Sequence, residues 1–167
     1  DILLATRQGM CIRFPVPDVR VFSGRTSTGV RGIKLDKGDN VIAMSILRHA
    51  EIDMEIRDAY LRASAASRRT DGEPNVDDAS LDEGAANIDP LAFETLAQNE
   101  QFVLAVTEKG FGKRTSAYEY RIAKRGGKGI ANLEITKRNG NVSATFPVEP
   151  EDQIMLVTDN GQLIRCP

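Results

Sequence analysis

The fold is decided by the stretch Ile2-Leu-Leu-Ala-Thr6-Arg-Gln-Gly9-Met-Cys-Ile-Arg13, because the chain repeats its pattern twice. The later copies are Val103-Leu-Ala-Val-Thr107-Glu-Lys-Gly110-Phe-Gly-Lys-Arg114 and Ile154-Met-Leu-Val-Thr158-Asp-Asn-Gly161-Gln-Leu-Ile-Arg165. Each copy is an apolar run, then Thr-x-x-Gly, then an arginine four residues after the glycine. A run of strand-forming residues, a glycine that tolerates a positive φ and a second run predict a β-hairpin. We therefore expect three hairpins.

The sequence that follows the first two hairpins repeats as well. Residues 29–35 parallel residues 129–135, and Asn40-Val-Ile-Ala43 parallels Asn141-Val-Ser-Ala144, which predicts about four strands in each unit. The second and third copies are 51 residues apart and the first and second are 101 apart, which leaves about 50 residues of insertion. A period near 50 with four short strands is typical of propeller-like blades. The alternative is an ordinary β-sandwich with a chance duplication.

These repeats divide the 167 residues into four segments. We predict a first blade over residues 1–49, an acidic insertion over 50–100, a second blade over 101–150 and the first hairpin of a third blade over 151–167. The insertion is expected to hold a helix over about 50–68, a solvated loop over 70–86 and a short helix that Asp89 caps before Pro90. Alternation at Ile52, Met54 and Ile56 would equally allow a strand at the start of the insertion. Because the chain opens without an initiator Met and stops after a hairpin, we expect a piece of a longer protein.

Charge is unevenly distributed between these segments. The net charge of the whole chain is −2, which by itself suggests no polyanionic partner. Residues 51–100 hold thirteen acidic and four basic residues, a net of −9, so the remaining residues carry +7. One hypothesis is that the insertion competes with a polyanion for the basic blades. The other is that it is a decoration without a role in binding.

Composition excludes several classes of protein and site. No apolar run approaches the roughly eighteen residues of a membrane span. Cys11 and Cys166 are far apart and belong to no CxxC or Cys/His cluster, so we expect neither a disulfide scaffold nor a zinc site. His49 has no nucleophile pattern nearby. We expect no catalytic residue and no metal site in this chain.

The most concentrated basic segment is Arg121-Ile-Ala-Lys124-Arg125-Gly126-Gly127-Lys128-Gly129. Closely spaced cations beside glycines suit phosphate oxygens, which backbone N–H groups can then approach. The segment lacks the order of a nucleotide-binding P-loop. A solvated hairpin loop is the alternative interpretation. The first unit has a matching loop over residues 23–31. Basic residues also follow the hairpin turns, at Arg13, Lys113, Arg114 and Arg165. In a radial array of blades, corresponding positions would point to the same rim.

These residues carry a resemblance to a known family. The chain outside the insertion, about 117 of its 167 residues, resembles the C-terminal domain of the DNA gyrase A subunit. The elements that carry it are Thr6-Arg-Gln-Gly9, Thr28-Gly-Val-Arg-Gly-Ile-Lys34, Gly110-Phe-Gly-Lys-Arg-Thr115, Ala117-Tyr-Glu-Tyr120, Glu134-Ile-Thr-Lys-Arg-Asn-Gly140 and Asp152-Gln-Ile-Met155. Residues 124–129 resemble the family's gyrase box, Gln-Arg-Arg-Gly-Gly-Lys-Gly, with Ala123 in place of Gln and Lys124 in place of Arg.

The resemblance implies an all-β fold, a six-bladed β-pinwheel whose blades exchange strands with their neighbours, of which this chain would be blades four and five and the start of six. It implies a noncatalytic module that wraps duplex DNA for an ATP-dependent type IIA topoisomerase that introduces negative supercoils. ATP and Mg²⁺ would be used by other parts of the holoenzyme, an A2B2 assembly of A and B subunits in the bacterial cytoplasm, associated with the nucleoid. Tyr60, Tyr118 and Tyr120 would then be packing residues.

The expected DNA contacts follow from the basic segments and the resemblance together. Two rival functions stay open: the equivalent domain of topoisomerase IV, and a propeller-type module that binds proteins. The residues we expect at the DNA are Lys124, Arg125, Gly126, Gly127, Lys128 and Gly129, with Arg25, Arg31, Lys113 and Arg114.

Overall fold

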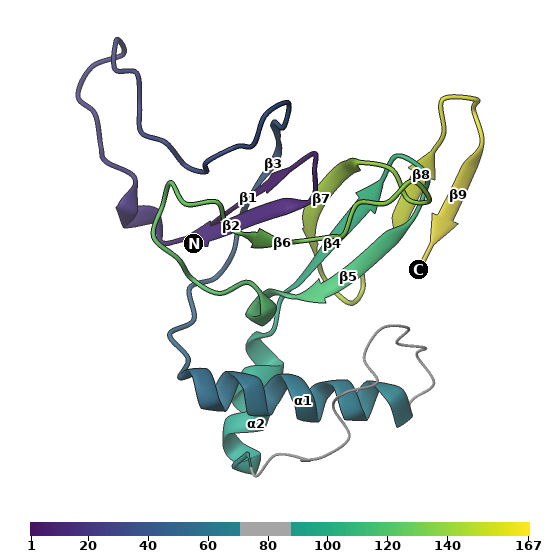
Figure 1. Ribbon diagram of the computed structural model, residues 1–167. Helices are drawn as coiled ribbons and strands as arrows, with labels where there is room; N and C mark the ends of the chain where they lie inside the picture. Colours follow the sequence, from purple (N-terminus) through teal and green to yellow (C-terminus); the bar gives the residue numbers. More distant parts are fainter. Residues whose placement is uncertain (71–87) are drawn as a thin grey trace.

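The computed structural model describes residues 1–70 and 88–167 (Figure 1). Its strands form three antiparallel sheets, with orders β3-β1-β2-β6, β5-β4-β7 and β8-β9. In chain order the elements are β1 (Ile2–Thr6), β2 (Met10–Phe14), η1 (Val16–Asp18), β3 (Val41–Ile46), α1 (Met54–Thr70), α2 (Pro90–Asn99), β4 (Phe102–Thr107), β5 (Gly112–Ser116), η2 (Ala117–Glu119), β6 (Ile130–Ala131), β7 (Val142–Val148), β8 (Ile154–Val157) and β9 (Leu163–Cys166).

The three predicted hairpins are confirmed as β1–β2, β4–β5 and β8–β9. Their turns share one construction. The glycine N–H donates to the carbonyl of the turn threonine at 2.9–3.2 Å, with glycine φ between 78° and 83°. The threonine hydroxyl accepts from the N–H that follows the glycine, at 3.1–3.3 Å. The motif therefore needs threonine for the hydroxyl acceptor and glycine for the positive φ.

The prediction of about four strands in each unit is confirmed for the second unit, which contains β4, β5, β6 and β7, and wrong for the first, which contains only β1, β2 and β3. Residues 29–35 form no strand, and of residues 129–135 only Ile130 and Ala131 do. That strand, β6, pairs with β2 of the first unit, in the register Met10↔Ala131 and Cys11↔Ile130. The first sheet thus takes its fourth strand from the second unit, as the strand exchange implied by the resemblance requires.

The two larger sheets share a core. A buried cluster joins Leu3, Ala5 and Cys11 of the first sheet to Val103 of the second sheet and Tyr120 beside η2. Because side chains alternate along a strand, this cluster covers one face of the first sheet only. On the opposite face Ile12 and Phe14 pack with Ile33 and Ala123, which come from irregular segments. Strands β1 and β2 are therefore covered on both faces, whereas Met44 and Ile46 of β3 stay exposed.

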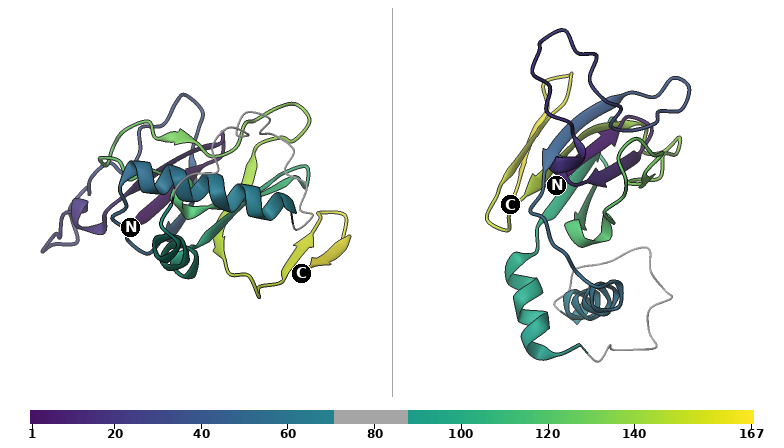
Figure 2. Two further views of the ribbon diagram at one scale, coloured as in Figure 1. Left: turned by 90° about the horizontal axis from the view of Figure 1, so that it is seen from below. Right: turned by 90° about the vertical axis from the view of Figure 1, so that its left-hand side faces the viewer.

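Both helices belong to the predicted insertion, and they lie to one side of the sheets (Figure 2). The predicted cap is confirmed, since the Asp89 carboxylate accepts from the Ala92 N–H at 3.2 Å. The helices are anchored on η2 by aromatic contacts: the Tyr60 ring lies 5.6 Å from Tyr118 and 5.1 Å from Phe93. The Tyr118 hydroxyl donates to the Leu96 carbonyl at 3.0 Å. The predicted acidic loop, from residue 71 onward, lies outside the described residues.

The predicted packing role of the three tyrosines is confirmed by their burial. Tyr60, Tyr118 and Tyr120 are 1%, 5% and 3% exposed. Tyr120 donates its hydroxyl to the Asn132 side chain at 2.7 Å, next to β6. Burial raises the pKa of the phenols of all three, as expected for rings that pack and do not ionise.

The two cysteines are expected to differ sharply in reactivity. Cys11 is fully buried, and desolvation raises the pKa of its thiol to about 12, whereas Cys166 is only partly buried. Only the thiolate attacks an alkylating or disulfide reagent. At pH 8 the folded chain should therefore react at Cys166 and leave Cys11 unmodified until denaturant is added, as peptide mass analysis can show. Rapid native labelling of Cys11 would contradict the packing of β2.

Candidate nucleic-acid interface

The basic segment 121–129 connects η2 to β6 and lies along the first unit. The Gly126 N–H donates to the Gly32 carbonyl at 2.7 Å, and the Lys34 N–H donates to the Gly127 carbonyl at 2.8 Å. At its start, the Ala123 N–H donates to the Arg13 carbonyl at 2.8 Å. The segment is thus a bridge between two units, not a solvated hairpin loop within one.

Arg125 contributes to this bridge through its side chain. Its Nε–H donates to the Asp18 carbonyl at 3.0 Å, and its Nη1 donates to the Arg31 carbonyl. Both acceptors belong to the loop between β2 and β3. Two of the guanidinium's donors are therefore used on backbone oxygens, and Arg125 holds the matching loop of the first unit against the basic segment.

The other cations of the segment face solvent. Arg121, Lys124 and Lys128 are exposed, as is Arg31 on the loop that Arg125 holds. Lys128 Nζ lies 3.0 Å from an Asp36 carboxylate oxygen, with both side chains about three-fifths exposed. Such a surface pair contributes little to stability and can exchange a carboxylate for another anion. The bridge and the loop beside it therefore present a group of exposed cations at the joint between the units.

A cavity of about 210 Å³ lies between strand β2 and the basic segment. It is lined by Cys11, Ile12 and Arg13 of β2 and by the cations Arg121, Lys124 and Lys128. A concave rim with several like charges attracts an anion more strongly than a flat surface with the same charges. Arg121 belongs to the basic segment but was not one of the contacts expected from the sequence.

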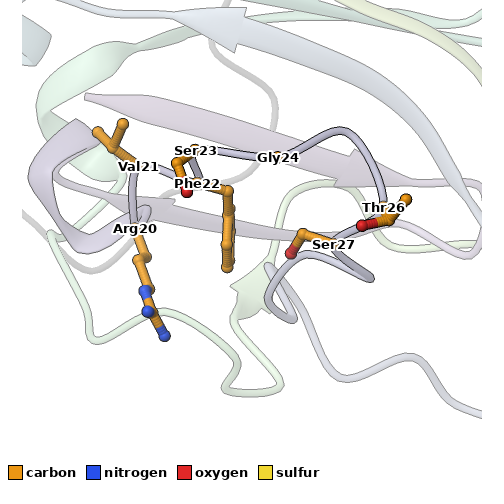
Figure 3. Close-up of a pocket in the computed structure, with 7 residues that line it drawn as sticks. All are labelled: Arg20, Val21, Phe22, Ser23, Gly24, Thr26 and Ser27. Atoms are coloured by element: carbon orange, nitrogen blue, oxygen red, sulfur yellow. The ribbon is translucent and has the colours of Figure 1, made fainter.

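Arg25 lies on the loop between η1 and β3, which is exposed from Val19 through Arg31. The loop encloses an open pocket of about 400 Å³, which is lined by residues 20–24, 26 and 27. Figure 3 shows the side chains of Arg20 and Phe22 extending from the same side of the loop, and the Arg20 guanidinium carbon is 5.4 Å from the Phe22 ring centre. Sequence reasoning missed this pair, although it stands next to the matched loop 23–31.

Lys113 and Arg114 belong to β5 of the second sheet, apart from the bridge. Both are exposed. The Arg114 guanidinium carbon lies 5.1 Å from the Phe102 ring centre, a cation–π distance. Alternation along β5 places the two side chains on opposite faces of the sheet. The structure thus does not bring this pair into the cluster of Lys124, Lys128 and Arg31.

The prediction that Arg13 points to a basic rim is wrong. Its side chain is 4% exposed and pairs with Asp1 at 2.8 Å. Its Nη1 donates to the Ala117 carbonyl at 2.8 Å, and its Nη2 donates to the Arg48 carbonyl at 2.9 Å. Burial lowers the pKa of the Arg13 guanidinium, though arginine stays charged at neutral pH. His49, the single histidine, is half exposed, with Nδ1 2.7 Å from the other Asp1 carboxylate oxygen.

Residues 1–70 and 88–167 contain neither a membrane-spanning helix nor a metal-binding cluster. No helix in these ranges is long and apolar enough to cross a membrane. Nor do these ranges bring together three or more His, Cys, Asp or Glu side chains in a way that could hold a metal ion.

Sequence comparison identifies the family of the basic bladed part. The family described as "DNA gyrase C-terminal domain, beta-propeller" matches residues 1–48, 101–149 and 152–167. The long unmatched stretch coincides with the segment that holds α1 and α2. The predicted fold class is thereby confirmed.

Several curated relatives align with almost the whole chain. The DNA gyrase A subunit of Granulibacter bethesdensis is 51% identical over 100% of this chain and 19% of its own length. The same subunit of Rickettsia prowazekii is 44% identical over 99% of the chain and 18% of its own length. The chain thus spans less than one fifth of these relatives.

Two solved structures share the fold at low sequence identity. The C-terminal domain of DNA topoisomerase IV superposes with a TM-score of 0.63 at 16% identity, and the DNA gyrase A C-terminal domain with 0.57 at 17%. Each alignment covers 98% of this chain and 36% of the other. From its sequence match and its relatives, the chain belongs to the family of DNA gyrase C-terminal domains.

Proposed function

We propose that this chain is part of a DNA-wrapping module of the gyrase A subunit, which binds duplex DNA without reading its sequence. The observation that carries the proposal is the bridge of residues 121–129, fixed by backbone hydrogen bonds with Lys124, Lys128 and Arg31 exposed around it. Fixed cations that contact only phosphates position a duplex without specifying bases. The net charge of +7 outside residues 51–100 supports the same partner.

The bridge suits wrapping because it lies where two units meet. A basic segment at each joint would place cations at regular intervals around a curved edge, and a duplex that follows the edge bends without base contacts. Arg125 acts here as a positioning residue, since its donors hold the loop that carries Arg31. Arg25, and the Arg20–Phe22 pair beside it, would extend the contact onto the first unit.

The proposed context is the bacterial holoenzyme. Gyrase A and B subunits, as an A2B2 assembly in the cytoplasm at the nucleoid, would use ATP and Mg²⁺ elsewhere, while this module wraps the DNA that is passed through the break. The module itself needs no cofactor and supplies no catalytic residue.

Salt dependence tests the proposed contacts. With six to eight phosphates engaged, log K for duplex binding should fall against log salt with a slope of about −5 to −7. Replacing Lys124 and Lys128 by alanine in the full-length gyrase chain should make that slope about 2 units shallower, because two counterion-releasing contacts are lost. Fluorescence anisotropy across a salt series measures both slopes.

A matched control is Arg62→Ala, which removes an exposed charge from α1, outside the bladed part. It should leave the slope unchanged. A slope near zero in the unmodified protein would reject DNA binding and favour a protein-interaction module. A supercoiling assay on relaxed plasmid, with the gyrase B partner and ATP, distinguishes a gyrase function from a topoisomerase IV function. DNA binding without the introduction of negative supercoils would favour the topoisomerase IV function.

A further inference from the structure

The three hairpins place an arginine at the same register position. Arg13 lies opposite Leu3, Arg114 opposite Leu104 and Arg165 opposite Met155. Because directly opposed residues share a face of an antiparallel pair, the three arginines project from the same face of their hairpins. The contacts that Arg13 makes in the first sheet therefore predict the contacts that Arg114 makes on the corresponding face of the second sheet.

In the first sheet this face is the joint with the second unit. Arg13 Nη1 donates to the carbonyl of Ala117 at 2.8 Å and lies 3.5 Å from that of Tyr120, so the guanidinium caps the 3₁₀ turn η2. Around it Leu3 and Ala5 pack on Val103 in a buried cluster. A guanidinium fork that binds carbonyls at both ends of a short turn fixes the orientation of the neighbouring unit.

The second sheet has an equivalent face, but its side chains are only partly buried. Leu104 and Val106 project from it beside Arg114, and both are only partly buried, whereas Leu3 and Ala5 are 1% exposed. Phe102 takes the position of Asp1 in the repeat, and Arg114 stacks on its ring at 5.1 Å. An aromatic ring can orient a guanidinium as a carboxylate does.

The third unit supplies the matching surface. Ile154 and Leu156 of β8 occupy the repeat positions of Val103 and Ala105, buried side chains of the second sheet, of which Val103 packs on the first. The hairpin β8–β9 pairs with no other described strand. Its side chains Met155 and Ile164 are 60% and 57% exposed.

We propose that Arg114 is the clamp for the third unit: it caps the 3₁₀ turn that follows β9 in the full-length protein, while Ile154 and Leu156 pack on Leu104 and Val106. The occupant is the next repeat of the same polypeptide, because the first joint and the second have the same register and the same residue positions. Arg114 is thereby a residue that orders neighbouring units and not a DNA contact. This inference concerns how units join and does not depend on DNA binding.

The test uses the full-length gyrase chain carrying Arg114→Lys, which keeps the charge and removes the planar fork. Backbone amides of residues 154–166 should exchange hydrogen about tenfold faster than in the unmodified protein, because charge-assisted bonds at the joint are lost. The salt slope of DNA binding should stay unchanged. Arg13→Lys should have the same effect on residues 117–120 and serves as the positive control.

Lys113→Ala is the matched control, since it removes a cation one residue away on the opposite face. It should leave exchange of residues 154–166 unchanged. The proposal is overturned if Arg114→Lys leaves that exchange at the unmodified rate while Arg13→Lys speeds exchange at residues 117–120. It is equally overturned if exchange in β1 rises as much as in β8–β9, or if Arg114→Ala makes the salt slope about 1 unit shallower without changing exchange.

Discussion

Replacing Arg13 by alanine is expected to lower the free energy of unfolding of the chain by about 3–5 kcal/mol, because the buried Asp1 carboxylate loses its cation. The Arg13 and Asp1 side chains are 4% and 1% exposed, with an Nη2–Oδ2 distance of 2.8 Å. The substitution also removes the donors to the Ala117 and Arg48 carbonyls. The loss falls on the joint between the first and second units, since Ala117 begins η2.

Urea denaturation followed by circular dichroism measures this loss. Arg13→Lys keeps the charge but not the fork, so it should fall between the alanine variant and the unmodified chain. Arg165→Ala is the control, because this arginine holds the same repeat position but is exposed in the described structure, and it should change stability by less than about 0.5 kcal/mol. A loss below about 1 kcal/mol in Arg13→Ala would contradict a structural clamp.

Local features of the fold could be predicted from sequence because their causes are local. The Thr-x-x-Gly motif forms a turn through contacts between Thr6, Gly9 and Met10 alone, and it does so three times. The cap at Asp89 likewise depends on the next few residues. Family resemblance added what these motifs do not contain, the radial arrangement and the exchange of strands.

Arg13 could not be predicted as buried, because its environment is made by distant segments. Asp1 and Arg48 come from the two ends of the first unit, and Ala117 meets the guanidinium only after the second unit packs on the first. In sequence it is one of several arginines at a repeated position, and two of them, Arg114 and Arg165, are exposed. Repetition therefore predicted the register correctly and the accessibility wrongly.

The packing of the insertion was also beyond sequence reasoning. Helical periodicity places a helix near residues 50–68, but it does not show that Tyr60 meets Tyr118 or that its hydroxyl donates to Glu100 at 2.8 Å. Tyr118, which contacts both helices, lies on η2, and Arg13 caps that turn from the other unit. The helical part of the insertion thus braces the joint, whatever the charge of residues 71–87 contributes.

Replacing Gly129 by alanine is expected to lower the free energy of unfolding by about 3 kcal/mol, because two costs add at one site. Gly129 has φ of +79°, a region that an L-residue adopts at a cost. A Cβ built there would lie 2.0 Å from the Cys11 carbonyl oxygen and 3.2 Å from Ile12 Cβ. Strand β2 cannot yield, since it is the buried partner of β1 and β6. The expected result is loss of β6 from the first sheet, seen by hydrogen exchange of residues 130–131.

The Gly127→Ala variant distinguishes two possible roles of the glycines in the basic segment: packing at the joint between the units, and close approach of the backbone to a DNA phosphate. Gly127 has no positive φ, and the nearest atom to an added Cβ is 3.7 Å away, so stability should change by less than about 1 kcal/mol. If the glycines act through phosphate approach, Gly127→Ala should weaken DNA binding in a fully folded protein, as Gly129→Ala would. If they act through the joint, only Gly129→Ala should weaken binding, and in proportion to its loss of stability. The geometry favours the second outcome, because the Gly126 N–H already donates to the Gly32 carbonyl, and Gly129 lies against the backbone of β2.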